Sequence, residues 1–336
     1  MTLQQKKTLY LVIGIIISVV LLWVLFRDIR FAELVDALKG ANYWWLIPNI
    51  ILIVVTMYQR AYRWHFMVLP IKRLRFSKLL ASTCIGFMAN NVLPLRLGEF
   101  VRAYSLSHEQ EGVTKSASLA TIFVERMIFD LVALLFIFGL VVSQSELALS
   151  DDMKQGLKIV VGLALIGIAF MLLLAVRADS TGRILSKYLF FLPLTLREKV
   201  HGLVLKFSRG LEFLKSIKSV IMVALHTMII WFLLGISNIF VFWAFGFDIP
   251  LEASVVLLVV VSISILIPSS PGFVGVYHAG AVWSLEQYGI GRAEALSCAI
   301  VLHAAQYSIV TLMGFYFLHK EHLSLRKLEE EATAST

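Results

Sequence analysis

Residues 89–102 of the 336-residue chain read ANNVLPLRLGEFVR and interrupt an apolar segment with amides, a proline, a glycine and charged side chains. The apolar run before them, residues 79–87, is too short to cross a bilayer. An unpaired backbone group in hydrocarbon costs several kcal/mol, so a broken helix is stable there only when protein or a water-filled cavity surrounds it. This stretch therefore predicts a broken helix within a membrane protein.

A second interrupted stretch, residues 268–278, reads PSSPGFVGVYH. Both stretches contain the pattern Pro-x-x-x-Gly, as Pro94 to Gly98 and as Pro271 to Gly275. Segments broken by proline and glycine at corresponding positions of two halves are typical of transporters built from inverted repeats, and they indicate the binding site. We expect the two stretches to form re-entrant hairpins that meet near the middle of the membrane.

The composition is typical of an integral membrane protein. Hydrophobic residues make up 59% of the chain and charged residues 15%, whereas a soluble domain carries about 25% charged residues. Both cysteines lie in apolar stretches, and no histidine, cysteine and carboxylate cluster has metal-site spacing, so no disulfide, metal or other cofactor is expected. Without a nucleophile elbow, a P-loop or a dinucleotide-binding motif, the sequence does not favour an enzyme.

The apolar segments predict an all-α fold with an inverted-topology repeat. The first repeat covers residues 1–142 and the second covers residues 157–318, each with three spans and one re-entrant hairpin. The predicted spans are residues 9–26, 43–62, 117–142, 157–176, 220–245 and 293–318, and the predicted re-entrant hairpins are residues 78–97 and 251–287. This amounts to about six full spans and two hairpins, or eight helices when each hairpin is counted as one.

Basic residues gather in the segments between alternate spans. Residues 60–78 carry several arginines and lysines and no acidic residue, whereas residues 248–252 carry acidic residues and no basic one. Because cytoplasmic loops are enriched in lysine and arginine, both termini are predicted to be cytoplasmic. The two halves then have opposite orientations in the plasma (inner) membrane, which the chain is expected to cross several times.

Residues 197–218 combine an apolar stripe at helical spacing with a basic opposite face. This pattern predicts an amphipathic helix on the anionic cytoplasmic leaflet. We therefore assign the net charge of +8 to the membrane surface, and we expect no nucleic-acid partner. The tail, residues 319–336, is polar, and we expect it to end in disorder.

Three ionisable side chains lie within the predicted span at residues 117–142, namely Glu125, Arg126 and Asp130. An ionisable residue inside a span is costly and indicates a functional site. Arg126 and Asp130 are four positions apart and could pair on one helical face. The alternative is that Glu125 and Arg126 anchor the helix at the membrane interface.

Arg96, Glu99 and Arg102 follow the first break at spacings of three, which predicts that they share one helical face. Two guanidinium groups near a helix N-terminus suit a phosphate, because each can bind two oxygens and the helix dipole adds attraction. The alternative is a cytoplasmic anchor in which Glu99 pairs internally. Asn90 is a candidate binding residue, although capping of the broken backbone is its more ordinary role.

In the second stretch, Gly272 would leave backbone amides exposed at the break, and His278 is the titratable group nearest to it. The ordinary interpretation of such a histidine is an interhelical hydrogen bond. An intramembrane enzyme that uses His278 and Glu286 would lack a nucleophile.

Four motifs in order carry a resemblance that covers nearly the whole chain. They are residues 60–64 (RAYRW), Asn90-x3-Pro94-x3-Gly98-Glu99-x2-Arg102, Glu125-Arg126-x3-Asp130 and Pro268-x2-Pro271-Gly272-x2-Gly275. With them the chain resembles the flippase-like membrane domain of lysylphosphatidylglycerol synthases and its stand-alone relatives. The resemblance implies a lipid-translocating module without the aminoacyl-transferase domain of the synthases. The chain differs from many relatives at His278, where they carry an acidic residue.

We therefore expect a flippase or transporter for an anionic phospholipid or a lipid-linked saccharide, with membrane lipids as its partners. The headgroup phosphate would lie between the hairpin tips, held by Arg96, Arg102 and backbone amides, and the ionisable residues of span 117–142 would line or gate its path. The alternative is a non-transporting membrane subunit that docks a cytoplasmic lipid- or glycan-modifying enzyme through residues 197–218.

Overall fold

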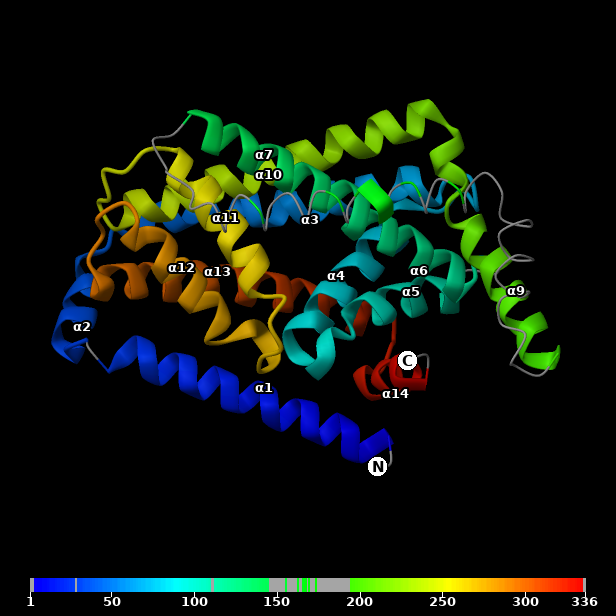
Figure 1. The fold of residues 1–336 in the computed structure, drawn as a ribbon, viewed down its shortest axis with the longest axis horizontal. Coiled ribbons are helices and arrows are strands. Elements are labelled where there is room, and N and C mark those ends of the chain that lie inside the picture. The colour runs from blue at the N-terminus through cyan, green and yellow to red at the C-terminus, as the bar shows by residue number, and fades with distance from the viewer. Residues whose placement is uncertain are drawn as a thin grey trace. The chain divides into compact units, whose positions relative to one another are not determined.

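The computed structural model describes residues 3–27, 29–109, 112–144 and 194–334, together with a few helical positions between 155 and 173. Every regular element in these ranges is a helix (Figure 1), which confirms the predicted all-α class. The predicted span at residues 157–176 lies largely outside the described residues.

The helices belong to two compact units. The first comprises Met1–Met57, Cys84–Gly98 and Trp231–His322, and the second comprises Tyr58–Thr83, Glu99–Ile230 and Leu323–Thr336. Each unit combines segments from both predicted repeats, so the packing units and the sequence halves divide the chain differently. The repeat boundaries at residues 1–142 and 157–318 stay predictions.

The first unit holds both helix breaks. Its elements are α1 (Leu3–Phe26), α2 (Phe31–Gly40), η1 (Tyr43–Trp45), η2 (Pro94–Arg96), α11 (Glu252–Ser264), η5 (Pro271–Phe273), α12 (Val276–Glu286), α13 (Arg292–Lys320), and parts of α3 (Leu46–Val68), α4 (Phe76–Val92) and α10 (Ile217–Ala244). In it, α12 packs against α1, α11 and α13, and α13 packs against α2. Val241, Leu285 and Leu296 belong to its apolar core.

The break between α11 and α12 follows from the length of α11 and from two glycines. α11 has 13 residues, which at 1.5 Å per residue gives about 20 Å, less than the hydrocarbon core of a bilayer. The chain then turns back through Gly272 and Gly275, whose φ angles of 76° and 90° lie in the left-handed region that favours glycine. The predicted interruption is confirmed, and α11 and α12 pack against each other (Figure 1). The side from which this hairpin enters the membrane stays a prediction.

The first break is equally local in origin. α4 ends at Val92, the short 3₁₀ turn η2 begins at Pro94, and α5 (Gly98–Glu109) follows. Leu93 has extended backbone angles, as the steric clash with a following proline ring requires. Proline also has no N–H to continue the helical ladder. The interruption predicted at residues 89–102 is therefore confirmed.

The second unit contains the remaining elements. They are α5, α6 (Lys115–Val124), the π-helical segment η3 (Glu125–Asp130), α7 (Leu131–Gln144), α9 (Leu194–Arg209), η4 (Glu212–Lys215), α14 (Leu325–Ala334), and the other parts of α3, α4 and α10. α6 packs against α9. Trp64, Leu106 and Phe213 are fully buried in the core of this unit.

The predicted span at residues 117–142 is not one regular α-helix. α6 runs directly into the π-helical segment Glu125–Asp130, and α7 continues from Leu131. The π-helical segment contains all three ionisable residues that the sequence indicated in this span. Such segments occur frequently at functional sites.

Two polar segments differ from the prediction. The amphipathic helix expected at residues 197–218 ends at Arg209, and a 3₁₀ turn follows. Val204 and Phe207 are partly buried against the core of the second unit, whereas Leu203 is 55% exposed, so the position of this helix on a membrane surface stays a prediction. Most of the tail is helical as α14, and its Leu328 is 1% exposed because this apolar side chain packs into the unit; the last two residues, where disorder was expected, lie outside the described residues.

Among the described residues, α10 and α13 are long and apolar enough to cross a membrane, and the pair Leu11–Phe26 and Phe31–Gly40, bent by 86°, would count as a third span. The six predicted spans therefore stay a prediction.

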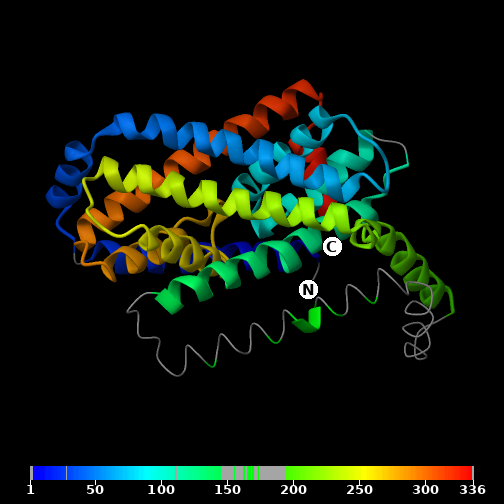
Figure 2. The same ribbon diagram turned by 90° about the horizontal axis from the view of Figure 1, so that it is seen from above.

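α3 and α10 run antiparallel and adjacent (Figure 2). Asn49 Nδ2 donates to Ser237 Oγ at 2.8 Å in the first unit, and in the second His226 Nδ1 lies 2.7 Å from Gln59 Oε1.

Candidate functional site

The predicted site residues fall into two groups, one in each unit. The first unit contains Asn90, Pro94, Arg96, Gly98, Pro271, Gly272, Gly275 and His278, and the second contains Glu99, Arg102, Glu125, Arg126 and Asp130. Arg96 and Arg102, which were expected to hold one phosphate together, belong to different units and have different partners.

Four residues of the first group, Asn90, Pro94, Arg96 and Pro271, line a cavity of about 200 Å³, which we call the hairpin-tip pocket. It is lined by Leu11, Asn90, Leu93, Pro94, Arg96, Leu266, Ile267, Pro268, Ser269, Ser270, Pro271 and Phe273. Most of these side chains are apolar, and the polar groups are one guanidinium, one amide and two hydroxyls. The sequence prediction that the two broken segments meet is therefore confirmed for their tips, since η2 also packs against η5.

Arg96 links the two tips. Its Nη1 donates to the carbonyl oxygen of Ile265 at 3.1 Å, and its guanidinium carbon lies 5.2 Å from the centre of the Phe273 ring. Its φ of 56° is uncommon for a residue with a side chain, and such backbone strain gathers at functional sites. Because α5 begins at Gly98, Arg96 does not share a helical face with Glu99 and Arg102, contrary to the spacing argument.

Asn90 and Gly98 close the first break. Asn90 Oδ1 accepts a hydrogen bond from the Gly98 N–H at 2.8 Å, which is the capping role that we gave as the ordinary interpretation. A side chain at Gly98 would overlap the carbonyl oxygen of Gly86 and the amide of Asn90, so the close approach requires glycine. Asn91 Nδ2 donates to Thr311 Oγ1 at 3.0 Å and so fixes this end of α4 to α13.

The second tip is held by α1. Ser18 Oγ accepts from the Ser270 N–H at 3.0 Å and donates to Ser270 Oγ at 3.0 Å. A side chain at Gly275 would lie 2.9 Å from the Ser18 carbonyl oxygen, too close for a real Cβ. The tip therefore depends on backbone packing against α1, a helix that the sequence argument had not connected with the site.

His278 is not one of the residues that line the pocket. Its Nδ1 accepts from the Gly275 N–H at 3.4 Å, at the start of α12. Its ring meets His303 edge-on with 4.9 Å between centroids, and His303 stacks on Tyr277 at 4.4 Å. The structure thus gives His278 a capping role within α12 and a packing contact with His303 of α13, and the hydrogen bond it makes is local, not the interhelical one of the ordinary interpretation.

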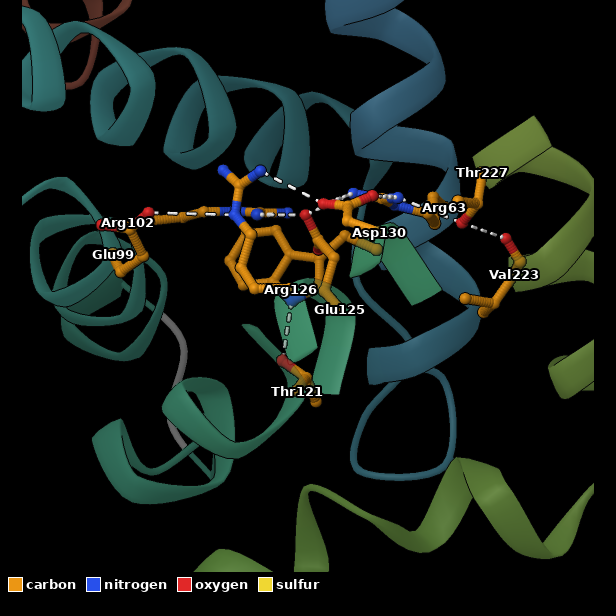
Figure 3. A network of polar contacts seen from close by, with 10 residues as sticks. Arg63, Glu99, Arg102, Thr121, Glu125, Arg126, Asp130, Val223 and Thr227 are labelled. Atoms are coloured by element: carbon orange, nitrogen blue, oxygen red, sulfur yellow. Dashed lines mark hydrogen bonds and ion pairs between the residues drawn. The ribbon is translucent and has the colours of Figure 1, made fainter. Parts of the chain in front are cut away.

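The second group forms a buried cluster of charges that we call the ion-pair network, comprising Arg63, Glu99, Arg102, Glu125, Arg126 and Asp130 (Figure 3). Arg63, at its centre, donates to Glu125 Oε1 at 2.7 Å, to the carboxylate of Asp130 and to Thr227 Oγ1 at 3.0 Å. Arg63 and Glu125 are fully buried. Removing one partner of a buried ion pair typically costs about 3–5 kcal/mol, because the other charge is left unpaired.

Arg102 and Arg126 occupy the other end of the network. Arg102 Nη1 donates to Glu125 Oε1 at 3.0 Å. Arg126 Nη1 donates to Asp130 Oδ2 at 3.2 Å, which confirms the pairing predicted from their spacing, and its Nε lies 3.8 Å from Glu99 Oε1. Arg126 and Glu99 are about one quarter exposed, so the network is accessible on their side.

The sequence analysis did not include Arg63 among the candidate site residues, although Arg63 lies in the motif at residues 60–64. α3 continues to Val68, beyond the predicted end at residue 62, and this buries Arg63 and Trp64 completely. The signal that could have found Arg63 is charge balance, because two carboxylates inside a span require cationic partners.

The family model described as "Lysylphosphatidylglycerol synthase TM region" matches residues 11–314. A UPF0104 membrane protein of Methanocaldococcus jannaschii is 23% identical over 72% of this chain and 98% of its own length. Another from Methanothermobacter thermautotrophicus is 24% identical over 93% of this chain and 94% of its own. Glycosyltransferase AglD of Haloferax volcanii is 24% identical over 96% of this chain and 56% of its own.

No solved structure matches the chain. The family match, however, extends over most of its length and includes both helix breaks and the ion-pair network. The apolar helices and the membrane-protein relatives agree with a membrane location. The protein belongs to the lysylphosphatidylglycerol synthase transmembrane-region family.

Proposed function

We propose that the protein transports an anionic phospholipid or a lipid-linked saccharide across the plasma membrane. The observation that carries this proposal is the hairpin-tip pocket. Two segments that are distant in the sequence, each broken by proline and glycine, meet around one small cavity. Broken helices of this kind surround the substrate in many secondary transporters.

The wall of the pocket suits a lipid headgroup next to an apolar chain. The guanidinium of Arg96 and the hydroxyls of Ser269 and Ser270 can bind a phosphate, and the leucine, isoleucine and proline side chains around them can contact hydrocarbon. Arg96 reaches across from η2 to the backbone before η5. A ligand that competes for this guanidinium would loosen the contact between the tips, and this couples binding to movement.

The ion-pair network supports a functional interpretation of the second unit. Ionisable residues within membrane segments are costly and mark substrate or ion pathways in many membrane proteins. Arg126 and Glu99, on the accessible side of the network, are placed to guide a charged headgroup, whereas Arg63 and Glu125 are fully buried and hold the segment together.

The family and its relatives support both candidate substrates. The family name refers to a synthase of an aminoacylated phosphatidylglycerol. One relative is a glycosyltransferase, which suits a lipid-linked saccharide. The two candidates share a phosphate next to a long apolar chain, and this is the chemistry that the hairpin-tip pocket would recognise.

The proposal can be tested by mass spectrometry of the lipids that co-purify with the protein. We expect a minor anionic lipid to be enriched over the bulk membrane with the wild type and lost with Arg96→Ala. Arg326→Ala serves as the matched control, because Arg326 is 88% exposed and pairs with Glu330 on the surface of α14. If the lipids that co-purify with wild type, Arg96→Ala and Arg326→Ala all have the composition of the bulk membrane, a specific headgroup site is contradicted.

Translocation is then measured directly in proteoliposomes with fluorescent phosphatidylglycerol as the probe. We expect wild type and Arg326→Ala to move the probe between the two leaflets at the same rate. Arg96→Ala should reduce this rate to that of liposomes without protein. The experiment is repeated with a polyprenyl-phosphate saccharide as the probe. If correctly folded wild type moves neither probe faster than protein-free liposomes do, transport is contradicted.

A second function has one observation in its favour. The chain matches 56% of the length of a protein named as a glycosyltransferase, so this kind of membrane domain also occurs within a larger enzyme. On this basis the protein would be a non-transporting membrane subunit for a cytoplasmic lipid- or glycan-modifying enzyme. Substitution of the basic residues Lys206 and Arg209 on α9 should then abolish function, while Arg96→Ala should be tolerated; transport predicts the reverse.

A further inference from the structure

The guanidinium of Arg102 is held rigidly in the second unit. Its side chain is 2% exposed, its carbon Cζ lies 4.0 Å from the centre of the Trp64 ring, and its Nη1 donates to Glu125 Oε1. Trp64 is itself fixed, because its Nε1 donates to Thr121 Oγ1 at 2.8 Å. One face and one nitrogen of this guanidinium are therefore already engaged.

The opposite edge of the same guanidinium consists of Nε and Nη2. Both nitrogens of Arg102 are buried, and neither has a hydrogen-bond partner among the described residues. These two nitrogens form the side of an arginine that donates two parallel hydrogen bonds to two oxygens of one oxyanion. A buried donor without a partner costs about 1–3 kcal/mol, so this edge favours a ligand that has such oxygens.

A cation also lies on the accessible side of the network. The side chain of Arg126 is 28% exposed, and that of Glu99, 3.8 Å from its Nε, is 26% exposed. An anion that approaches from this side therefore meets a guanidinium before it reaches the buried part of the network.

We propose that the Nε and Nη2 edge of Arg102 is a binding site for a phosphate group. A phosphodiester offers two free oxygens on one phosphorus, and so it matches the paired donors. The group would arrive from the side of Arg126 and Glu99, which are partly exposed. The proposed function supplies one source, a phospholipid headgroup, and free inorganic phosphate has the same chemistry.

The site is distinct in composition from the hairpin-tip pocket, because none of the residues lining that pocket belongs to the ion-pair network. A protein that transports lipid but binds no phosphate at Arg102 would contradict this inference alone. Binding at Arg102 without transport would contradict the proposed function alone.

The test uses the full-length protein in a maltoside detergent, which contains no phosphate. Binding of radiolabelled inorganic phosphate is measured by equilibrium dialysis, and binding of phosphatidylglycerol is measured by native mass spectrometry. We expect at least one probe to occupy a single saturable site in the wild type, and Arg102→Lys to weaken its affinity about tenfold or more, because lysine keeps the charge but loses the paired donors.

Arg326→Lys is the matched control, since the same change at an exposed arginine should leave the affinity unchanged. Arg96→Lys tests whether the probe binds in the hairpin-tip pocket instead. Binding of inorganic phosphate identifies a free anion as a ligand, whereas binding of phosphatidylglycerol alone identifies a headgroup. Equal affinity of wild type and Arg102→Lys, or no saturable binding of either probe, would overturn the proposal and leave water as the partner of this edge.

A second measurement does not depend on the folding of a variant. The wild type is labelled with ¹⁵N-arginine and studied by solid-state NMR. The dipolar coupling to the ³¹P nucleus of a bound phosphate should dephase the Nε signal of an arginine. A spectrum without such dephasing, with the probe present at saturating concentration, would also overturn the proposal.

Discussion

Arg63 shows how strongly the buried charges of the second unit depend on single side chains. It contacts two carboxylates and a threonine hydroxyl, and its own side chain is inaccessible to solvent. The contribution of this residue is best described as the cost of leaving Glu125 and Asp130 with one cation fewer, since a well-packed apolar replacement of the entire cluster could be nearly neutral.

We predict that Arg63→Met lowers the free energy of unfolding by about 3–5 kcal/mol, because it leaves two buried carboxylates short of a partner. The measurement is thermal or denaturant-induced unfolding of the purified protein. A double variant with Asp130→Asn should recover part of the loss, because it removes one of the unpaired charges.

The control for this prediction is Arg326→Met, whose exposed pair with Glu330 should contribute less than about 1 kcal/mol. If Arg63→Met proves as stable as this surface variant, the ion-pair network does not hold the second unit together.

At the scale of elements, the contact between α6 and α9 depends on the absence of a side chain. A Cβ at Gly210 would overlap the carbonyl oxygen of Ala117 and the methyl group of Ala120, so the chain after α9 approaches the backbone of α6 directly. Among the described residues, no neighbouring atom lies within 4 Å of such a Cβ at Gly202, within α9.

We therefore predict opposite effects of one substitution at the two glycines. Gly210→Ala should destabilise by about 1–3 kcal/mol through overpacking, whereas Gly202→Ala should stabilise by about 0.5–1 kcal/mol through helix propensity. Unfolding midpoints and hydrogen exchange of α9 measure both. Equal effects of the two substitutions would show that α9 does not pack against α6 in this way.

The helix α14 is attached to α6 by a pH-dependent contact. Lys115 Nζ donates to Glu331 Oε2 at 2.6 Å, and this hydrogen bond, together with the charge of the lysine, lowers the pKa of Glu331 below its ordinary value. A depressed folded pKa means that the stabilisation is present above the ordinary pKa of about 4.3 and is lost as the pH falls through the lowered value.

We predict that α14 is protected from hydrogen exchange at pH 7 and loses protection below about pH 4, after correction for the intrinsic pH dependence of exchange. Lys115→Met should reduce the protection at pH 7 and remove this pH dependence. Protection that stays constant down to pH 3 in the wild type would indicate that the apolar contact of Leu328 alone holds the helix.

These elements also show what local sequence can predict. The two breaks were predictable because proline, glycine and amides act within a few residues of the chain. The end of α9 and the helical tail were not, because the burial of Phe207 and Leu328 depends on partners elsewhere in the second unit. The apolar stripe of α9 has the same spacing whether membrane or protein covers it, so the position of this helix on a membrane surface stays a prediction.

At the scale of the molecule, the site residues depend on contacts between parts of the chain that are far apart in sequence. Ser18 of α1 binds Ser270 of the second tip, and Asn91 of the first break binds Thr311 of α13. The convergence of the breaks could be predicted from their matching patterns, whereas the role of α1 and the position of Arg63 could not. Both arise from tertiary packing that no short motif encodes.

We predict that a reversible cross-link between α1 and the second tip stops transport. The Oγ atoms of Ser18 and Ser270 are 3.0 Å apart, so Ser18→Cys combined with Ser270→Cys should form a disulfide on oxidation. If the tip moves during transport, oxidation should block movement of fluorescent phosphatidylglycerol and reduction should restore it. The single variant Ser18→Cys is the control, and unchanged transport by fully cross-linked protein would contradict movement at this contact.

The π-helical segment explains how two carboxylates of one helix reach the same guanidinium. Glu125 and Asp130 are five positions apart, and in a regular α-helix they would differ in direction by about 140° around the helix axis. In a π-helix, residues separated by five positions are joined by the backbone hydrogen bond and point to similar sides, and both side chains bind Arg63. The pairing of charges thus depends on the winding of the backbone, so any change of state that rewound residues 125–130 as an α-helix would turn one carboxylate away from Arg63.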